Sequence, residues 1–243
     1  MEKINESIKG LVYTLRNSKK FEPNKIFKNR RVAIVGPADS AFDNAYGSYI
    51  DDFDYVIRIN KTPSSWNPEN EKYIGRKTDI WFHSFFENRD SGGGPLDPYI
   101  IKNMNIEYLV NPRSSFKAYR RTFNFYRKYQ ENISVYHLES KVYKDLLYKF
   151  PKKLRPTVGF VALYSALKSE CEELYITGYT FFKTPYAKGY RDHLLDLDKN
   201  KMHFKSQGIH DADLEYQIFK STIQNHNCKI LNIDNKLNEI LNS

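Results

Sequence analysis

The sequence contains only two cysteines, Cys171 and Cys228, among its 243 residues. Two thiols cannot form the disulfide framework of a small secreted domain, so we expect a reducing compartment, with a single bridge between the two left open. The sequence also lacks any run of the ~18 apolar residues that a membrane-spanning helix requires, and no apolar segment follows the N-terminus. We therefore expect neither a secreted nor a membrane-anchored product, and we expect a cytoplasmic location.

The composition is that of a protein with a folded core. Hydrophobic residues make up 40% of the chain and aromatic residues 15%, which argues against disorder. A chain of this length forms one large domain or two small ones.

Positive charge is concentrated at the beginning of the chain. Residues 1–31 contain nine basic and three acidic side chains, which account for +6 of the net charge of +9. Aliphatic residues recur there at helical spacing: Ile4, Ile8, Leu11, Val12 and Leu15. We interpret residues 1–29 as a basic amphipathic segment whose apolar stripe packs on the rest of the protein. The alternative is a peripheral contact with the inner face of a bacterial membrane.

Residues 30–243 alternate between short apolar runs and helical stretches, and we assign them to one catalytic domain. The runs that predict strands are 31–35, 55–59, 79–82, 106–110, 134–137, 174–177 and 229–233. The stretches with helical length and period are 114–129, 141–148, 158–168 and 211–225. This alternation predicts a single α/β domain with a mostly parallel sheet flanked by helices. Ligands of such sheets bind beyond the carboxyl ends of the strands, where the strand order reverses.

Two segments carry little signal for regular structure. Asn88–Asp97 is rich in glycine, and Phe181–Lys205 is long for a loop inside a compact domain. We expect both to be mobile. A lid or binding loop and a segment without function are equally compatible with this pattern.

Gly36 stands where the strand 31–35 meets the next segment. A glycine at such a turn lets backbone N–H groups approach a phosphate at a helix N-terminus. The GxGxxG pattern of dinucleotide-binding domains is absent, so Gly36 alone is only a weak indication of a nucleotide.

Three acidic triplets have the spacing to hold Mg²⁺ or Mn²⁺ against a diphosphate: Asp52–Asp54, Asp196–Asp198 and Asp211–Asp213. Such triplets also arise by chance in a chain with 29 acidic residues, and Asp211 has the position of a helix cap. We favour this second interpretation.

His210 precedes a predicted helix, and Glu215 follows five residues later. A neutral imidazole suits a general base that takes a proton from a sugar hydroxyl. A purely structural histidine is the alternative.

The basic and aromatic stretch Phe116–Tyr129 fits two structures. It could stack on bases and contact phosphates, or it could form an amphipathic helix whose aromatic side chains face the sheet. We favour the helix and expect no nucleic-acid partner.

Four segments follow one another in a characteristic order: RRVAIVGPADSAFDNAYGSYIDDFDYVIRINKTP (Arg30–Pro63), PTVGFVALYSALKSECEELYITGY (Pro156–Tyr179), HLLD (His193–Asp196) and HDADLE (His210–Glu215). In this order they resemble the long, short, third and very short motifs of the sialyltransferases of glycosyltransferase family 29. The resemblance covers roughly residues 30–225.

The resemblance implies a Rossmann-like, GT-A-like fold and an inverting transfer of sialic acid from CMP-sialic acid to a glycan or glycolipid hydroxyl. It implies no metal and no further cofactor. By position, His210 would be the general base, His193 would stabilise the departing phosphate, and Glu215 would complete the catalytic set. The donor's phosphate and ribose would lie against Gly36, Ala38 and Asn60, and its cytidine against Thr157, Val158, Gly159 and Gly178.

The sequence departs from the family pattern at three places. Pro37 replaces an amide residue and has no N–H to donate. Val32 replaces a cysteine, so Cys171 lacks its usual disulfide partner, as in a bacterial-type cytoplasmic protein. Leu194 and Leu195 stand where aromatics are expected, which makes His203 a competitor of His193.

Three alternatives stay open at this point. The donor sugar could be another CMP-linked ulosonate, such as 3-deoxy-manno-octulosonate (Kdo). The protein could instead be a metal-dependent nucleotide-sugar transferase that uses an acidic triplet, or a non-catalytic nucleic-acid-binding module.

Overall fold

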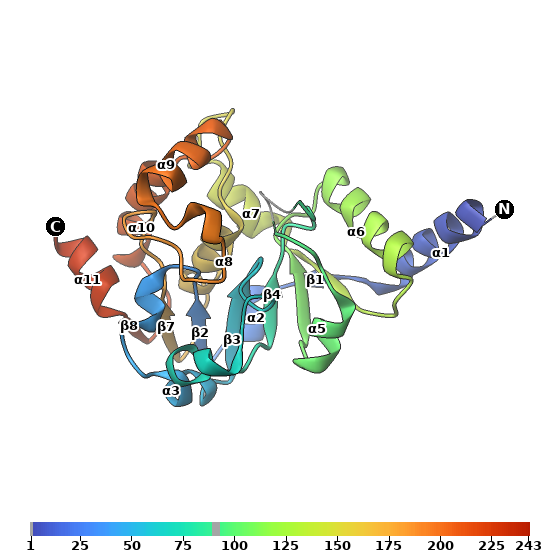
Figure 1. Ribbon diagram of the computed structural model, residues 1–243. Helices are drawn as coiled ribbons and strands as arrows, with labels where there is room; N and C mark the ends of the chain where they lie inside the picture. Colours follow the sequence, from blue (N-terminus) through green and yellow to red (C-terminus); the bar gives the residue numbers. More distant parts are fainter. Residues whose placement is uncertain (1, 89–92) are drawn as a thin grey trace.

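A single parallel sheet organises the protein. The computed structural model describes residues 2–88 and 93–243, and in this part of the chain eight strands pair side by side in the order β1-β6-β5-β4-β3-β2-β7-β8 (Figure 1). All seven pairings are parallel. The strands are β1 (Ser18–Phe21), β2 (Arg31–Val35), β3 (Tyr55–Ile59), β4 (Ile80–Phe82), β5 (Tyr108–Asn111), β6 (Val135–Leu138), β7 (Glu173–Thr177) and β8 (Ile230–Ile233). The predicted single α/β domain is confirmed.

Helices cover the sheet. They are α1 (Glu2–Asn17), α2 (Pro23–Phe27), α3 (Gly47–Asp51), α4 (Glu71–Ile74), α5 (Pro98–Asn103), α6 (Phe116–Tyr129), α7 (Ser140–Leu147), α8 (Val158–Leu167), α9 (Leu197–Ser206), α10 (Ala212–Ile223) and α11 (Asn235–Asn242). Three short 3₁₀ turns lie at Asp39–Phe42 (η1), Pro68–Asn70 (η2) and Asp192–Leu194 (η3).

The apolar runs form strands because both faces of the sheet are buried. In β2, Val32 and Ile34 belong to the core cluster that contains α8, whereas Ala33 and Val35 belong to the cluster that contains α3. A strand buried on both sides needs apolar residues at every position rather than at alternate ones. This is why the run at 31–35 was recognisable from sequence.

The strand order reverses between β2 and β7. From β2 the chain steps outward through β3, β4, β5 and β6, and then returns to place β7 on the other side of β2. The carboxyl ends of β2 and β7 therefore flank the crevice where sheets of this kind bind ligands.

The segments with weak sequence signals are more regular than expected. The expectation of little helix in Phe181–Lys205 is wrong, because this segment contains η3 and most of α9. The edge strand β1 and the C-terminal helix α11 were also not predicted. Residues 89–92 of the glycine-rich segment lie outside the described residues, and Gly93–Asp97 contain no helix or strand.

The N-terminal helix α1 packs on α6, but not through its aliphatic stripe. Gly10 sits against the backbone of Arg127, and the ring centroids of Tyr13 and Tyr126 are 5.9 Å apart. The aliphatic stripe is 43–75% exposed, so the interpretation that it packs on the rest of the protein is wrong. Gly10, Tyr13 and Thr14 lie on the opposite side of a helix from Ile8, Leu11 and Leu15, and the stripe consequently points away from α6.

Both cysteines are buried and carry free thiols, so the optional disulfide is not formed. Among the described helices, none is long and apolar enough to cross a membrane.

Arg58 in β3 is a fully buried cation that holds a turn in place. Its Nη2 donates to the carbonyl oxygens of Ile74 (2.7 Å) and Gly75 (2.9 Å), and its Nε donates to that of Lys77 (3.0 Å). Burial lowers the pKa of the guanidinium to about 10, so the side chain still carries its charge at neutral pH.

We predict that Arg58→Ala lowers the free energy of unfolding by about 3 kcal/mol, because it removes three charge-assisted hydrogen bonds and opens a cavity. Urea denaturation measures this change. The control is Arg30→Ala, whose side chain is 56% exposed and whose loss should change stability by less than about 0.5 kcal/mol. Equal effects of the two substitutions would contradict the role assigned to Arg58.

Candidate active site

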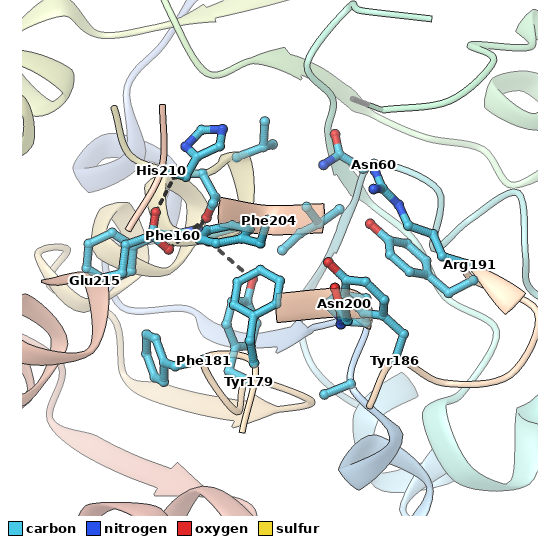
Figure 2. A pocket seen from close by; sticks show the side chains of 18 of the residues that line it. Asn60, Phe160, Tyr179, Phe181, Tyr186, Arg191, Asn200, Phe204, His210 and Glu215 are labelled. Atoms are coloured by element: carbon cyan, nitrogen blue, oxygen red, sulfur yellow. Dashed lines mark hydrogen bonds between the residues drawn. The ribbon is translucent and has the colours of Figure 1, made fainter. Parts of the chain in front are cut away.

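A cavity of about 450 Å³ opens at the carboxyl ends of the central strands. Most of the residues assigned from sequence line it: Ala38, Asn60, Thr157, Val158, Gly159, Gly178, His210 and Glu215. Gly36 and His193 are not among its lining residues. Figure 2 shows His210 and Glu215 on one side of the cavity, Asn60, Arg191 and Tyr186 on the other, and Tyr179 between them.

Gly36 and Gly178 pack against each other at the base of the cavity. A Cβ atom on Gly36 would lie 2.2 Å from the carbonyl oxygen of Gly178, and one on Gly178 would lie 2.6 Å from that of Gly36. Gly178 also has φ +73°, a conformation that favours glycine. The ends of β2 and β7 can approach this closely only because both residues lack a side chain.

The turn after β2 does not offer the amide groups that its glycine suggested. Gly36 N donates to Thr177 O (2.8 Å), Ala38 N to Gly178 O (3.1 Å) and Asp39 N to Pro185 O (3.1 Å). Pro37 has no N–H, and its carbonyl accepts from Ala187 N at 2.9 Å. The backbone of this turn is therefore bonded to the end of β7 through Gly36 and Ala38, and to the 185–187 segment through Pro37 and Asp39.

Asn60 is fixed at the end of β3 in a left-handed conformation, with φ +48°. Its backbone N–H donates to Phe82 O (2.8 Å), and its side-chain Oδ1 accepts from Ser84 N (3.2 Å). These contacts orient the remaining amide group toward the side of the cavity where Arg191 lies (Figure 2).

The N-terminus of α8 faces the cavity and is capped by Thr157. The Thr157 Oγ1 accepts from Phe160 N at 3.1 Å. The same hydroxyl donates to Glu215 Oε2 (2.9 Å), and Thr157 N donates to Glu215 Oε1 (2.6 Å). Glu215 thus ties α10 to the first turn of α8, whose early N–H groups lack partners within the helix.

Glu215 is 3% exposed, and burial raises the pKa of its carboxyl to about 8. The two hydrogen bonds from Thr157 oppose this shift, while Asp211 adds to it. At neutral pH the carboxyl is therefore mostly protonated.

His210 is held through its Nδ1, which donates to the carbonyl oxygen of Arg155 at 2.6 Å. The ring stacks near Phe204, with centroids 5.7 Å apart. Burial lowers the pKa of His210, the Arg155 carbonyl opposes this change, and the charge of Arg113 lowers the pKa further. The imidazole is consequently neutral at pH 7, with Nε2 unprotonated and able to accept a proton.

The two competing histidines are placed differently. His193 lies in η3 and is exposed, whereas His203 in α9 lines the cavity. Their ring centroids are 6.5 Å apart. The geometry therefore favours His203 for a contact with a bound ligand.

Sequence reasoning missed the arginines and tyrosines of the cavity wall: Arg113, Arg121, Arg191, Tyr186 and Tyr190. Arg113 follows the carboxyl end of β5, and this position relative to a predicted strand was the only available signal. Arg121 comes from α6, the predicted amphipathic helix, whose Phe125 and Tyr126 are buried.

The acidic triplets serve structural roles. Asp52 pairs with Arg31 (2.7 Å) near the amino end of β3, away from the cavity. Asp196 and Asp211 cap α9 and α10. Within residues 2–88 and 93–243, no three His, Cys, Asp or Glu side chains gather as a metal site.

The raised pKa of Glu215 predicts a pH dependence of stability. Its stabilising contribution is complete below pH 4.5, where the carboxyl is protonated in both states, and is lost as the pH rises toward about 8. We expect Glu215→Gln, which mimics the protonated carboxyl, to reduce the loss of unfolding free energy between pH 5 and pH 8 by on the order of 2 kcal/mol. Urea titrations at both pH values measure it, with the exposed Glu69→Gln as control. Parallel pH profiles for the wild type and Glu215→Gln would contradict the assignment.

The family model of Glycosyltransferase family 29 (sialyltransferase) matches residues 1–91 and 94–227. A CMP-N-acetylneuraminate-beta-galactosamide-alpha-2,3-sialyltransferase 1 from Pan troglodytes is 26% identical over 200 residues, covering 78% of this chain and 54% of the relative. The protein of the same name from Gallus gallus is 24% identical over 227 residues, covering 88% and 62%. The chain thus spans little more than half the length of these relatives.

Two solved structures share the fold. A mammalian sialyltransferase in complex with Gal-beta-1-3GalNAc-ortho-nitrophenol has a TM-score of 0.53 at 15% identity, covering 91% of this chain and 77% of that one. An alpha-2,3-sialyltransferase from Campylobacter jejuni in apo form has a TM-score of 0.52 at 16% identity, covering 90% and 79%. Because the family model matches nearly the whole chain, this protein belongs to glycosyltransferase family 29, the sialyltransferases.

Proposed function

We propose that this protein is an inverting sialyltransferase that transfers sialic acid from CMP-sialic acid to a hydroxyl group of a galactose-containing glycan. Family membership supports the donor class, and the names of the relatives support a β-galactoside acceptor. One observation carries the mechanism. A neutral histidine, fixed through its Nδ1, lies in the same cavity as the open N-terminus of α8.

The cavity has groups that suit each part of such a donor. Its volume lies within the range of small-molecule sites. The first turn of α8, at Val158 and Gly159, offers backbone N–H groups to the cytidine. On the opposite side, Asn60 and Arg191 suit the phosphate, which the committed amides of the turn after β2 cannot bind. Arg113 suits the carboxylate of the sialic acid, and the same carboxylate and phosphate would be present in CMP-Kdo.

In the proposed reaction His210 Nε2 removes the proton from the acceptor hydroxyl as its oxygen bonds to the anomeric carbon of the sugar. The bond from that carbon to the phosphate oxygen breaks at the same time, and CMP leaves with the electron pair. Attack opposite the leaving group inverts the anomeric centre. Asn60 and the arginine side chains of the cavity stabilise the charge on the phosphate of the departing CMP, so the reaction needs no metal ion.

The two alternative functions have less support. The acidic triplets that a metal-dependent transferase would use are engaged as ion-pair partners and helix caps. The aromatic side chains of α6 that a nucleic-acid module would expose for stacking include the buried Phe125 and Tyr126.

We also propose that α1 docks on an anionic membrane surface, which places the protein at the inner face of a bacterial membrane and favours a lipid-linked acceptor. Ile8, Leu11 and Leu15 are 56%, 53% and 75% exposed on the face turned away from α6. The exposed Lys9 and Arg16 lie three residues before and four residues after Val12, and so border this face. Aliphatic side chains flanked by cations are the pattern of an interfacial helix.

Charge favours a bilayer over a second copy of the chain. Residues 2–21 and α6 together contain ten basic and two acidic residues, or +8 of the net charge of +9. These segments lie side by side at one end of the molecule (Figure 1). Two such ends would repel each other, whereas anionic lipid headgroups would attract them.

The role of His210 predicts that His210→Ala lowers kcat by about 10²–10⁴-fold while CMP binding is unchanged, because only the proton acceptor is removed. The rate of the wild type should fall toward acid pH with an inflection below 6.5, since burial lowers the pKa of His210. Turnover with CMP-sialic acid and lactose measures the loss of kcat and the pH profile. Repeating the assay with EDTA tests whether the reaction depends on a metal ion.

The same assay separates the competing histidines, because we expect His203→Ala to lower kcat more than His193→Ala. Wild-type turnover in His210→Ala would refute the mechanism. Loss of activity with EDTA would refute its independence of metal.

Membrane docking predicts that the protein sediments with vesicles of phosphatidylcholine and phosphatidylglycerol, but much less with phosphatidylcholine alone. The triple variant Ile8→Ser, Leu11→Ser, Leu15→Ser should bind at least about tenfold more weakly, because its stripe no longer enters the bilayer. Its turnover on a soluble acceptor should not change.

The matched control is Tyr148→Ser with Met202→Ser, which removes two exposed apolar side chains far from α1 in sequence. Light scattering after gel filtration tests the alternative that a second copy of the chain, rather than a bilayer, covers the aliphatic stripe. A wild-type dimer that becomes monomeric in the triple variant, without vesicle binding, would show that a second copy covers the stripe.

A further inference from the structure

A second cavity, of about 1070 Å³, lies beside the first. The two share Phe86 and Arg121 as lining residues, so they meet at one wall. The second cavity is formed between α6, α1 and the segment around residues 85–87. A group that enters it can therefore reach toward the donor site from the side of α6.

The lining of this second cavity is strongly cationic. Six basic side chains contribute to it: Lys3, Lys117, Arg120, Arg121, Arg127 and Lys128. The acidic side chains on it are Glu6 and Glu87, and Glu87 is already paired with Lys128 and bonded by the hydroxyl of Tyr129 (3.1 Å).

The cations arise from one face of α6. Positions 117, 120, 121, 124, 127 and 128 recur at intervals of three and four residues and form a single stripe, opposite the side whose Ala118 and Thr122 face the sheet. The helix contains no acidic residue. Like charges at these intervals destabilise an isolated helix, by a few tenths of a kcal/mol per pair, so folding alone does not favour this arrangement.

Among the described residues, the arginines at the wall between the cavities have no acidic partner. Arg121 is half-buried and donates from Nη1 to Ser84 O at 3.0 Å. Burial lowers its pKa, and the charges of Arg113 and Arg120 lower it further. Over residues 2–88 and 93–243, none of these three arginines forms an ion pair, and the Nε of Arg113 is buried without a hydrogen-bond partner.

The donor alone does not account for this charge. CMP-sialic acid carries one phosphate and one carboxylate, and the first cavity supplies Arg113, Arg121 and Arg191 for them. Lys117, Arg120 and Arg127 line only the second cavity. A ligand that remains in contact with these side chains must bring negative charge of its own.

We propose that the second cavity is the acceptor subsite and that it selects a glycan bearing carboxylate or phosphate groups. This inference rests on the proposed function for the identity of the donor, but not for the binding of the glycan. In this arrangement the hydroxyl to be modified lies near His210, and the charged part of the acceptor lies along the cationic stripe of α6. Long-range attraction by the stripe also speeds the encounter with such an acceptor.

Three acceptors with the same terminal galactose test the proposal: neutral lactose, lactobionate, which carries a carboxylate, and lactose 1-phosphate. Isothermal titration of the full chain in the presence of CMP measures their binding without turnover. We expect each anionic acceptor to bind at least about tenfold more tightly than lactose at low salt, with a difference that shrinks as salt screens the charges. A preference for one of the two anions identifies the charged group.

The variant that tests the stripe is Lys117→Gln with Arg120→Gln, since both residues lie outside the donor cavity. It should weaken binding of the anionic acceptors about tenfold, raise their KM to match, and leave the affinity for lactose and CMP unchanged. The control is Lys149→Gln with Lys153→Gln, which removes the same charge from exposed positions outside both cavities.

The outcomes separate this inference from the proposed function. Equal affinity of the wild type for all three acceptors, or an equal loss for lactose in the double variant, would overturn the acceptor subsite. Selective binding of the anionic acceptors without any transfer of sialic acid would support the subsite and overturn the proposed function.

Discussion

The contact between Gly36 and Gly178 is the constraint on which the rest of the site depends. The ends of β2 and β7 meet backbone to backbone there, at the reversal of strand order. Asp234 fixes this contact from behind, since its carboxylate accepts from Gly178 N (2.8 Å) and Thr177 Oγ1 (3.0 Å) and also from Leu237 N (2.7 Å) at the start of α11. Any side chain at either glycine would force the two strands apart. The strands are held close at the base of the crevice, and the segments that follow them stay paired above it, where Ala38 bridges Tyr186.

The local sequence pattern shows the sheet but not the walls of the site. The strands at 31–35 and 55–59 are readable because each is buried on both faces, so their buried positions hold apolar residues apart from the hydrogen-bonded Arg58. The edge strand β1 (SKKF) is not readable, since two of its four residues are exposed lysines and its pairing with β6 is set by a partner more than 100 residues away. Helix α9 was missed for a related reason: its sequence, LDKNKMHFKS, is weakly apolar, and the helix is held by its Asp196 cap and by Phe204 and Asn200, which are buried only after the chain has folded.

The same distinction applies to the site residues. His210 and Glu215 could be selected from sequence because they belong to a motif, but their properties come from partners that spacing does not show. The carbonyl of Arg155 sets which nitrogen of His210 carries the proton, and the amide of Thr157 sets the orientation of Glu215. Gly36 was selected for a phosphate contact, yet the amides of its turn donate to the end of β7, at Thr177 and Gly178, and to Pro185. A motif therefore identifies which residues meet at a site. The role of each residue depends on which of its donors and acceptors are not already bonded within the protein.

The distribution of charge relates the proposed acceptor cavity to the proposed membrane-docking helix α1. Nearly all the net charge lies on residues 2–21 and α6, while the donor cavity is lined mainly by apolar and neutral groups with three arginines. One face of α6 borders the proposed acceptor cavity, and α1, packed on α6, presents its aliphatic stripe outward. A soluble sugar acceptor would need neither feature. A lipid-linked, anionic acceptor makes use of both, because the helix that holds its charged groups is packed against the helix that meets the bilayer. On this view the basic segment at the N-terminus and the basic stripe of α6 are parts of one surface, which brings the acceptor to His210, the proposed general base, from the membrane side.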